Sequence, residues 1–166
     1  MSGGEMELDA LRRQLSKALD WEDAHAGFDR AVEGVPHEKQ GIVPPGFAWS
    51  LWQLVEHLRL TQFDILDFCR NPQYVEAGSM AAYWPPSAAP PSEGSWDEAI
   101  AGIRRDRDAL KAMARDAGVD LFARIPHGDG QTYLRELILV VDHSAYHIGQ
   151  IVAVRRALGI WSPGTP

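Results

Sequence analysis

The sequence predicts an all-α protein, an antiparallel four-helix bundle with one long crossover loop. Two observations lead to this prediction. Apolar residues recur at three- and four-residue spacing in four segments of the 166-residue chain, with no strand-like alternation of useful length between them. A proline- and alanine-rich stretch, residues 80–95, separates the second segment from the third. The length suits one domain with its own core. We expect that domain over residues 6–161, with flexible tails at 1–5 and 162–166.

The first two predicted helices are bounded by residues that favour helix ends. The first runs from about Glu5 to Val32, and a glycine and a proline follow it. The second begins after Ser50, where Ser50 and Gln53 have the spacing of a capping box. It ends before Pro72, because proline disfavours a helical conformation in the residue that precedes it.

The last two predicted helices have similar boundary signals. The third begins with a second capping-box pattern, Ser95 and Glu98, and runs to about Asp116. The fourth is capped by Thr132 and runs to about Leu158, where a glycine follows. At 1.5 Å per residue, helices of this size are about 30 Å long and can pack along most of their length.

The composition argues against several classes of partner. The net charge is −7, so a nucleic acid is not expected as a partner, because a protein that binds the phosphate backbone needs a basic surface. The acidic, polar N-terminus lacks the apolar core of a signal peptide. No apolar run appears long enough for a bilayer, so we expect no membrane partner. One cysteine, Cys69, permits no internal disulfide, which agrees with a reducing, cytoplasmic location.

Three histidines form the candidate site. His143 and His147 are four residues apart in the fourth predicted helix, so their side chains lie on one face about one turn apart. His57 belongs to the second predicted helix, which can face the fourth. A lone histidine at the margin of an apolar face is more often a core residue. Three of them favour a site for a divalent metal, with Zn²⁺ or Ni²⁺ the best candidates for imidazole ligands and positions left open for a substrate.

Rival metal sites fit the sequence less well. The zinc-protease helix requires glutamate after its first histidine, whereas Ser144 follows His143. A di-iron bundle requires two Glu-x-x-His motifs, and only Glu22 with His25 has that spacing. Cys69 lies twelve residues beyond His57 on the same predicted helix, about 18 Å away, and is better explained as a small buried residue.

Further candidates are residues that could move protons or support the ligands. His25 and Tyr146 are candidate catalytic residues for proton transfer. His25 could equally be a surface or capping residue. Asp64 lies on the same helix face as His57, two turns away, where it could orient a ligand from behind or pair with an arginine of the fourth helix.

The loop between the second and third helices is a candidate pocket wall. A long ordered loop in a small bundle is usually functional. Its adjacent aromatics, Tyr83 and Trp84, are expected to be partly buried, and we expect the loop over residues 78–94 to cover the open end of the metal cleft. A dimer interface is the other destination for these rings. Gln53 and Gln150 are further candidates for the substrate pocket.

Two stretches carry a resemblance to a known family. They are Trp49-Ser50-Leu51-Trp52-Gln53-Leu54-Val55-Glu56-His57-Leu58, and Asp142-His143-Ser144-Ala145-Tyr146-His147-Ile148-Gly149-Gln150 with Arg155-Arg156 after it. Tyr83-Trp84-Pro85 and Ile125-Pro126-His127-Gly128 add weaker matches. With these motifs the chain resembles the DinB-like family, within the DinB/YfiT-like superfamily of metal-dependent enzymes. The resemblance covers about residues 6–161.

The family resemblance implies both a fold and a range of functions. It implies a four-helix bundle that holds a divalent metal with His57, His143 and His147, and frequent homodimers. Relatives include thiol transferases that use mycothiol, bacillithiol or glutathione, and a maleylpyruvate isomerase. The fold alone does not select a substrate.

Two function classes follow. In the first, the protein is an enzyme whose metal activates a low-molecular-weight thiol or water for transfer to, or hydrolysis of, a small-molecule substrate. In the second, it is a non-catalytic stress-related or dimerising bundle with a structural or vestigial metal site. An enzyme needs access to the metal, with Tyr83 or Trp84 near the rim, whereas a structural site would be sealed by side chains.

Overall fold

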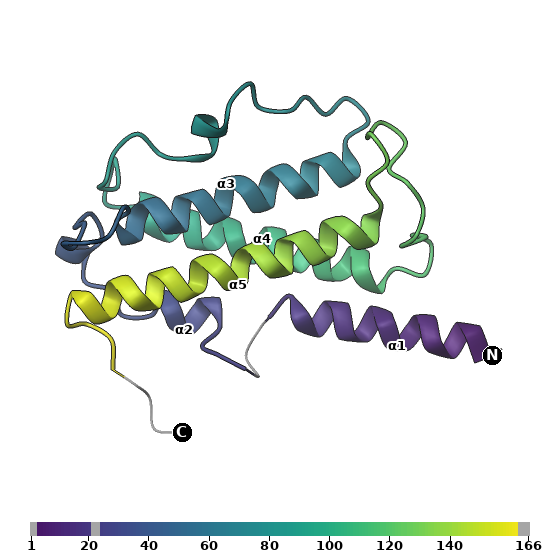
Figure 1. The fold of residues 1–166 in the computed structure, drawn as a ribbon, viewed down its shortest axis with the longest axis horizontal. Coiled ribbons are helices and arrows are strands. Elements are labelled where there is room, and N and C mark those ends of the chain that lie inside the picture. The colour runs from purple at the N-terminus through teal and green to yellow at the C-terminus, as the bar shows by residue number, and fades with distance from the viewer. Residues whose placement is uncertain (1–2, 21–23, 163–166) are drawn as a thin grey trace.

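The computed structural model describes residues 3–20 and 24–162, which form an all-α protein (Figure 1). The all-α prediction is confirmed, and the long helices pack as a four-helix bundle. The elements are α1 (Gly3–Ala18), α2 (Phe28–Val32), α3 (Leu51–Arg70), α4 (Ser95–Arg115) and α5 (Tyr133–Ala157), with short 3₁₀ turns η1 (His37–Lys39) and η2 (Met80–Tyr83).

The bundle is organised by one crossover. α3 packs against α4 and α5, and α1 packs against the same two helices on the other side. Gln62 donates to the carbonyl of Ile103, and Arg70 donates to that of Ala109, so α3 and α4 run in the same direction. The connection over residues 71–94 therefore returns along the length of the bundle, as Figure 1 shows above α3. α5 runs antiparallel to α3.

The first predicted helix is two helices in the structure, so its expected continuity from Glu5 to Val32 was wrong. α1 ends at Ala18, and α2 begins only at Phe28. The positions three and four residues after Leu19 are Glu22 and Asp23, whose carboxylates do not suit the core that an unbroken helix would need there. The N-terminal tail is also shorter than expected, because α1 begins at Gly3. Residues 1–2 and 163–166 lie outside the described residues.

Two of the three predicted N-caps are present. The Ser50 hydroxyl accepts from the backbone N–H of Gln53 at 3.1 Å, and the Gln53 Oε1 accepts from the N–H of Ser50 at 3.2 Å, which completes the capping box. Thr132 caps α5 with its hydroxyl. The predicted box at Ser95 was wrong, because Ser95 already lies in the first turn of α4 and Gly94 holds the N-cap position.

The core consists of two clusters along the bundle axis. One joins α2, the first half of α3, the first half of α4 and the second half of α5, and the other joins α1 to the remaining halves. The most deeply buried side chains of the first cluster include Leu51, Leu54, Val55 and Ile151; those of the second include Leu110, Leu121, Ile125 and Leu137. α3 and α5 contribute to both clusters, so apolar packing fixes their relative position along their whole length.

α5 is apolar for a reason that the bundle explains. By length and composition alone it could cross a membrane, which differs from the expectation that no run was long enough. Within the bundle, however, Leu137, Val140, Ile148 and Ile151 are buried against neighbouring helices. About a third of its apolar stretch is buried in this way, where α5 packs on α1, α2 and α3.

Candidate metal centre

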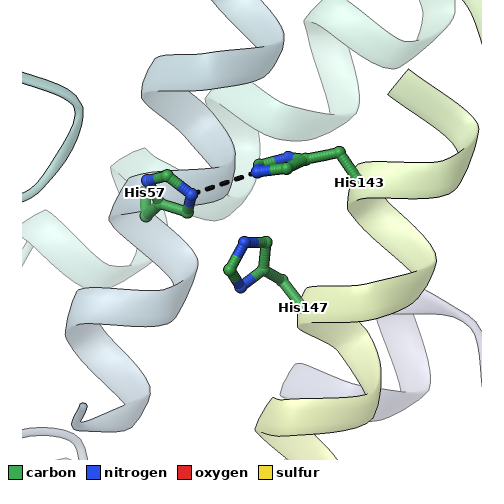
Figure 2. Close-up of side chains that lie close together, drawn as sticks. All are labelled: His57, His143 and His147. Atoms are coloured by element: carbon green, nitrogen blue, oxygen red, sulfur yellow. Dashed lines mark hydrogen bonds between the residues drawn. The ribbon is translucent and has the colours of Figure 1, made fainter. Parts of the chain in front are cut away.

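Three imidazoles converge between α3 and α5. His57 projects from α3, and His143 and His147 project from successive turns of α5 toward it (Figure 2). The Nε2 atoms of His57 and His143 are 3.1 Å apart, and one ring nitrogen from each of the three residues lies within 4.8 Å of the others. The structure thus brings together the three histidines that the sequence spacing selects, in a group that could hold a metal ion.

The far nitrogens of two rings are fixed by oxygen acceptors. The Nδ1 of His57 lies 2.7 Å from the carbonyl oxygen of Tyr83, and the Nδ1 of His147 lies 2.7 Å from the Oε1 of Gln150. Because these oxygens can only accept, each Nδ1 must carry the proton and donate it. Each Nε2 then keeps a lone pair. This is how an oxygen behind a histidine orients that histidine toward a metal.

His143 completes the set in a less constrained way. Its Nδ1 lies 3.5 Å from the Thr61 hydroxyl, which donates its own proton to the backbone carbonyl of His57 at 2.8 Å. The oxygen of Thr61 therefore has lone pairs left to accept from Nδ1 of His143. If Nδ1 of His143 carries the proton, the lone pair on its Nε2 faces the lone pair on Nε2 of His57, and the two nitrogens are 3.1 Å apart. Such an arrangement is favourable only with a proton or a cation between the two nitrogens, so this donor set fits a divalent metal.

The three rings are poorly solvated, which keeps them neutral. His57 is 4% exposed and His147 is 6% exposed. Burial, with the neighbouring imidazoles, lowers the pKa of His143 and of His147 to about 4, and burial also lowers the pKa of His57. Neutral imidazole is the form that binds a metal, so all three side chains are available as ligands at pH 7.

Aromatic rings from the two loops that flank α3 cover one side of the group. The Trp84 ring stacks on the imidazole of His57, with centroids 3.8 Å apart, and Trp49 stacks on the other face of Trp84 at 4.0 Å. Tyr83 contributes its carbonyl rather than its ring. Tyr146 is 64% exposed, with its ring 5.0 Å from that of His147, so it lies at the outer edge of the site.

The two glutamines expected in the substrate pocket make supporting hydrogen bonds in the structure. Gln53 is buried, and its side-chain oxygen belongs to the capping box at the start of α3. Gln150 accepts from Nδ1 of His147, so its side chain is directed at a candidate ligand. His147 and Gln150 are three residues apart on α5, and this spacing makes their contact possible.

Two predicted site residues lie elsewhere. His25 is in an exposed bend, where its Nδ1 is 2.9 Å from the carbonyl oxygen of Ala26, and it does not belong to the group of three histidines. Within residues 3–20 and 24–162, Asp64 makes no hydrogen bond to an arginine of α5 or to an imidazole. Its carboxylate accepts from the hydroxyl of Tyr74 at 3.0 and 3.1 Å.

The sequence interpretation missed three contributors. Thr61 is four residues beyond His57, so helical spacing alone could have placed it beside the site. The carbonyl of Tyr83 and the ring of Trp49 carry no such signal. Every residue has a backbone carbonyl, so its residue type does not mark it as an acceptor, and the periodicity of the sequence does not predict how a loop folds. Cys69 is buried, as expected, and its pKa is raised to about 12, chiefly by burial.

Comparison with known proteins is consistent with this geometry. No curated protein and no solved structure matches the chain. The family model of the DinB superfamily matches residues 20–151, which span most of the chain and include α3, α4 and all three histidines. On this match, the chain belongs to the DinB superfamily.

Proposed function

We propose that the protein is a metal-dependent enzyme that holds a divalent cation with His57, His143 and His147. The observation that carries the proposal is the convergence of three imidazoles, each with an oxygen placed behind its Nδ1. Three nitrogen ligands leave coordination positions open, as in catalytic sites. Zn²⁺ and Ni²⁺ are the ions best suited to such ligands.

The proposed reaction is transfer of a low-molecular-weight thiol, or hydrolysis by water. A bound divalent cation would lower the pKa of a thiol or a water molecule and supply a nucleophile near neutral pH. The protein keeps its ligands neutral by burial and covers His57 with Trp84. Tyr146, exposed beside His147, is the residue placed to exchange a proton with a substrate at the edge of the site.

A cavity of about 380 Å³ offers room for the body of a small substrate. It lies where α3 and α5 meet the loops after α3 and before α5, and none of the three histidines lines it. Its lining includes Asp64, Phe68, Tyr74, His127, Glu136 and Leu139. Asp64 is seven residues from His57 on α3, or about two helical turns. We propose this cavity as part of the substrate site. The only cysteine, Cys69, is buried, so a thiol would come from a small molecule.

The cellular setting is proposed on the same grounds. A buried, unpaired cysteine suits the reducing cytoplasm, and the charge of −7 disfavours nucleic acid. A homodimer is proposed because α5 has exposed apolar side chains on its outer side. Ile138 is 50% exposed and Tyr146 is 64% exposed, two turns apart. Light scattering of the purified protein would test this.

The decisive experiment is metal analysis followed by a screen for activity. The purified protein is expected to bind about one Zn²⁺ or Ni²⁺ per chain and to transfer one of several thiols to an electrophile, or to hydrolyse an ester or amide. His147→Ala should lose both properties. His37→Ala is the matched control, since His37 lies in the short turn η1 and does not belong to the group of three histidines.

The burial of His57 and His147 under Trp84 also suits a structural metal. A non-catalytic bundle would bind metal in the same experiment but show no turnover with any thiol or with water, and its metal would exchange slowly.

A further inference from the structure

Asp64 anchors the crossover loop to α3. It is half-buried, and its two carboxylate oxygens accept from the hydroxyl of Tyr74 at 3.1 Å or less. The hydroxyl of Tyr83 also lies close enough to Asp64 to interact with its carboxylate. Tyr74 and Tyr83 come from the beginning and the middle of the loop that returns along α3. One carboxylate therefore interacts with two separate points of that loop.

Tyr83 links this anchor to the candidate metal site. Its side-chain hydroxyl interacts with Asp64, while its backbone carbonyl accepts from Nδ1 of His57 at 2.7 Å. Asp64 and His57 are seven residues apart on α3. A single loop residue thus spans two turns of the helix. The next residue, Trp84, stacks on the ring of His57.

The rest of the turn has little to hold it in place. In η2, Met80 is 75% exposed, and the turn's hydrogen bonds, such as that from the N–H of Ala82 to the carbonyl of Ser79, lie within the loop itself. Internal bonds shape the turn but do not attach it to α3. Attachment to the helix next to His57 therefore depends on the side chain of Tyr83, its carbonyl and the ring of Trp84.

We propose that Asp64 is a positioning residue for the metal site, which acts through Tyr83 to present a carbonyl acceptor to His57. This inference rests on the proposed function in one respect, that His57 is a metal ligand. Asp64 makes no hydrogen bond to any of the three histidines, so its effect would pass through the loop. Outer contacts of this kind typically change metal affinity by about 10- to 100-fold.

The test compares four variants of the full chain. Tyr83→Phe removes one hydroxyl and leaves the backbone carbonyl in place. Asp64→Ala removes the anchor, and Asp64→Asn keeps one acceptor oxygen. Glu76→Gln is the matched control, because Glu76 is an exposed acid of the same loop that lies near Asp64 without a hydrogen bond to it.

Two measurements are made on each variant. In metal-free protein, nitrogen-15 NMR follows the Nδ1–H of His57, whose exchange with water is slowed by its bond to the Tyr83 carbonyl. In metal-loaded protein, transfer of Zn²⁺ to a chromogenic chelator gives the affinity and the release rate. We expect Tyr83→Phe and Asp64→Ala to lose the protected Nδ1–H signal and to bind Zn²⁺ about 10- to 100-fold more weakly. Asp64→Asn should be intermediate, and Glu76→Gln should match the parent protein.

The outcomes distinguish a failure of the role proposed for Asp64 from a failure of the proposed function. An unchanged Nδ1–H signal and unchanged release rate in Tyr83→Phe would overturn the role of Asp64, even if Asp64→Ala does not fold. If the parent protein binds no metal, the proposed function fails. The NMR comparison would still decide whether Asp64 positions His57.

Discussion

The rings of Trp84 and His57 lie face to face, with centroids 3.8 Å apart and an angle of 7° between their planes. The indole comes from the crossover loop and the imidazole from α3, so the stack joins a loop to a helix at the candidate metal site. Stacked aromatic pairs of this kind contribute about 0.5–1.5 kcal/mol beyond the burial of their area.

The Trp84 stack gives a direct optical prediction. Ni²⁺ bound by the three histidines would lie close to the indole of Trp84 and should quench its fluorescence. Titration of the metal-free protein with Ni²⁺ is expected to reduce the tryptophan emission, and Trp84→Phe should lose most of that reduction while it still binds the metal. Trp161→Phe is the control, because Trp161 packs near Arg30 and Arg155 instead. Equal quenching in both variants would contradict the placement of Trp84.

The metal-free protein should become less stable in mild acid. The pKa of His143 and of His147 is about 4 in the folded state, below the ordinary value of 6.5 expected when the chain unfolds. Between these values the unfolded chain binds more protons than the folded one, so the free energy of unfolding rises with pH. The stability that the neutral histidines contribute is complete above about pH 6.5 and is lost as the pH falls toward 4.

Thermal unfolding in a chelator between pH 4 and 7.5 measures this effect. The melting temperature of the parent protein should fall steadily below pH 6.5, and His143→Gln, which removes one of the titrating rings, should show a smaller fall. The same slope in both proteins would mean that the histidine cluster does not control the acid sensitivity.

The capping box at Ser50 should matter more than the hydroxyl of Ser95. Ser50 caps α3 and also donates to the carbonyl of Ala88 at 2.5 Å, with its side chain fully buried. Ser50→Ala is expected to reduce the free energy of unfolding by about 1–2 kcal/mol. Ser95→Ala should change it by less than about 0.5 kcal/mol, because the hydroxyl of Ser95 caps no helix. Urea unfolding of both variants decides this, and similar losses would contradict it.

Cys69 should be unreactive in the folded protein. It is 5% exposed, and burial raises the pKa of its thiol to about 12, whereas the thiolate is the reactive form. A disulfide reagent at pH 8 is expected to label it only after denaturant is added. Rapid labelling of the native protein would show that the thiol is reached by local opening, and would make Cys69 itself a candidate thiol for the chemistry.

The sequence predicted the elements that depend on periodicity and spacing. Helical spacing placed α3, α4 and α5, and the i, i+4 pair with His57 selected the three histidines. Helical spacing did not predict that α1 ends at Ala18 and that α2 begins only at Phe28. Spacing alone does not show how far along the chain an apolar helix face is packed against other helices. For Gln53 the sequence predicted both a capping box and a place in the substrate pocket, and the structure confirms the capping box.

The contacts made by loops were harder to foresee than those made by helices. The aromatic pair of the crossover loop was expected near the metal cleft, and Trp84 does lie there. The separate use of the Tyr83 backbone and side chain depends on the path of the loop, which local sequence rules do not determine. Asp64 was selected for its position on the face of His57, but its partners, Tyr74 and Tyr83, come from that same loop.

The distance in sequence between the candidate ligands has a consequence for folding. His57 and His143 are 86 residues apart along the chain, and their imidazoles meet only after α5 has docked against α3. An ion that requires all three rings therefore binds the closed bundle and not a chain in which α5 is detached. By mass action, such an ion would stabilise the docked helix by an amount that grows with the ion concentration and with its affinity for the three rings. Metal occupancy would then report whether the last helix has joined the bundle.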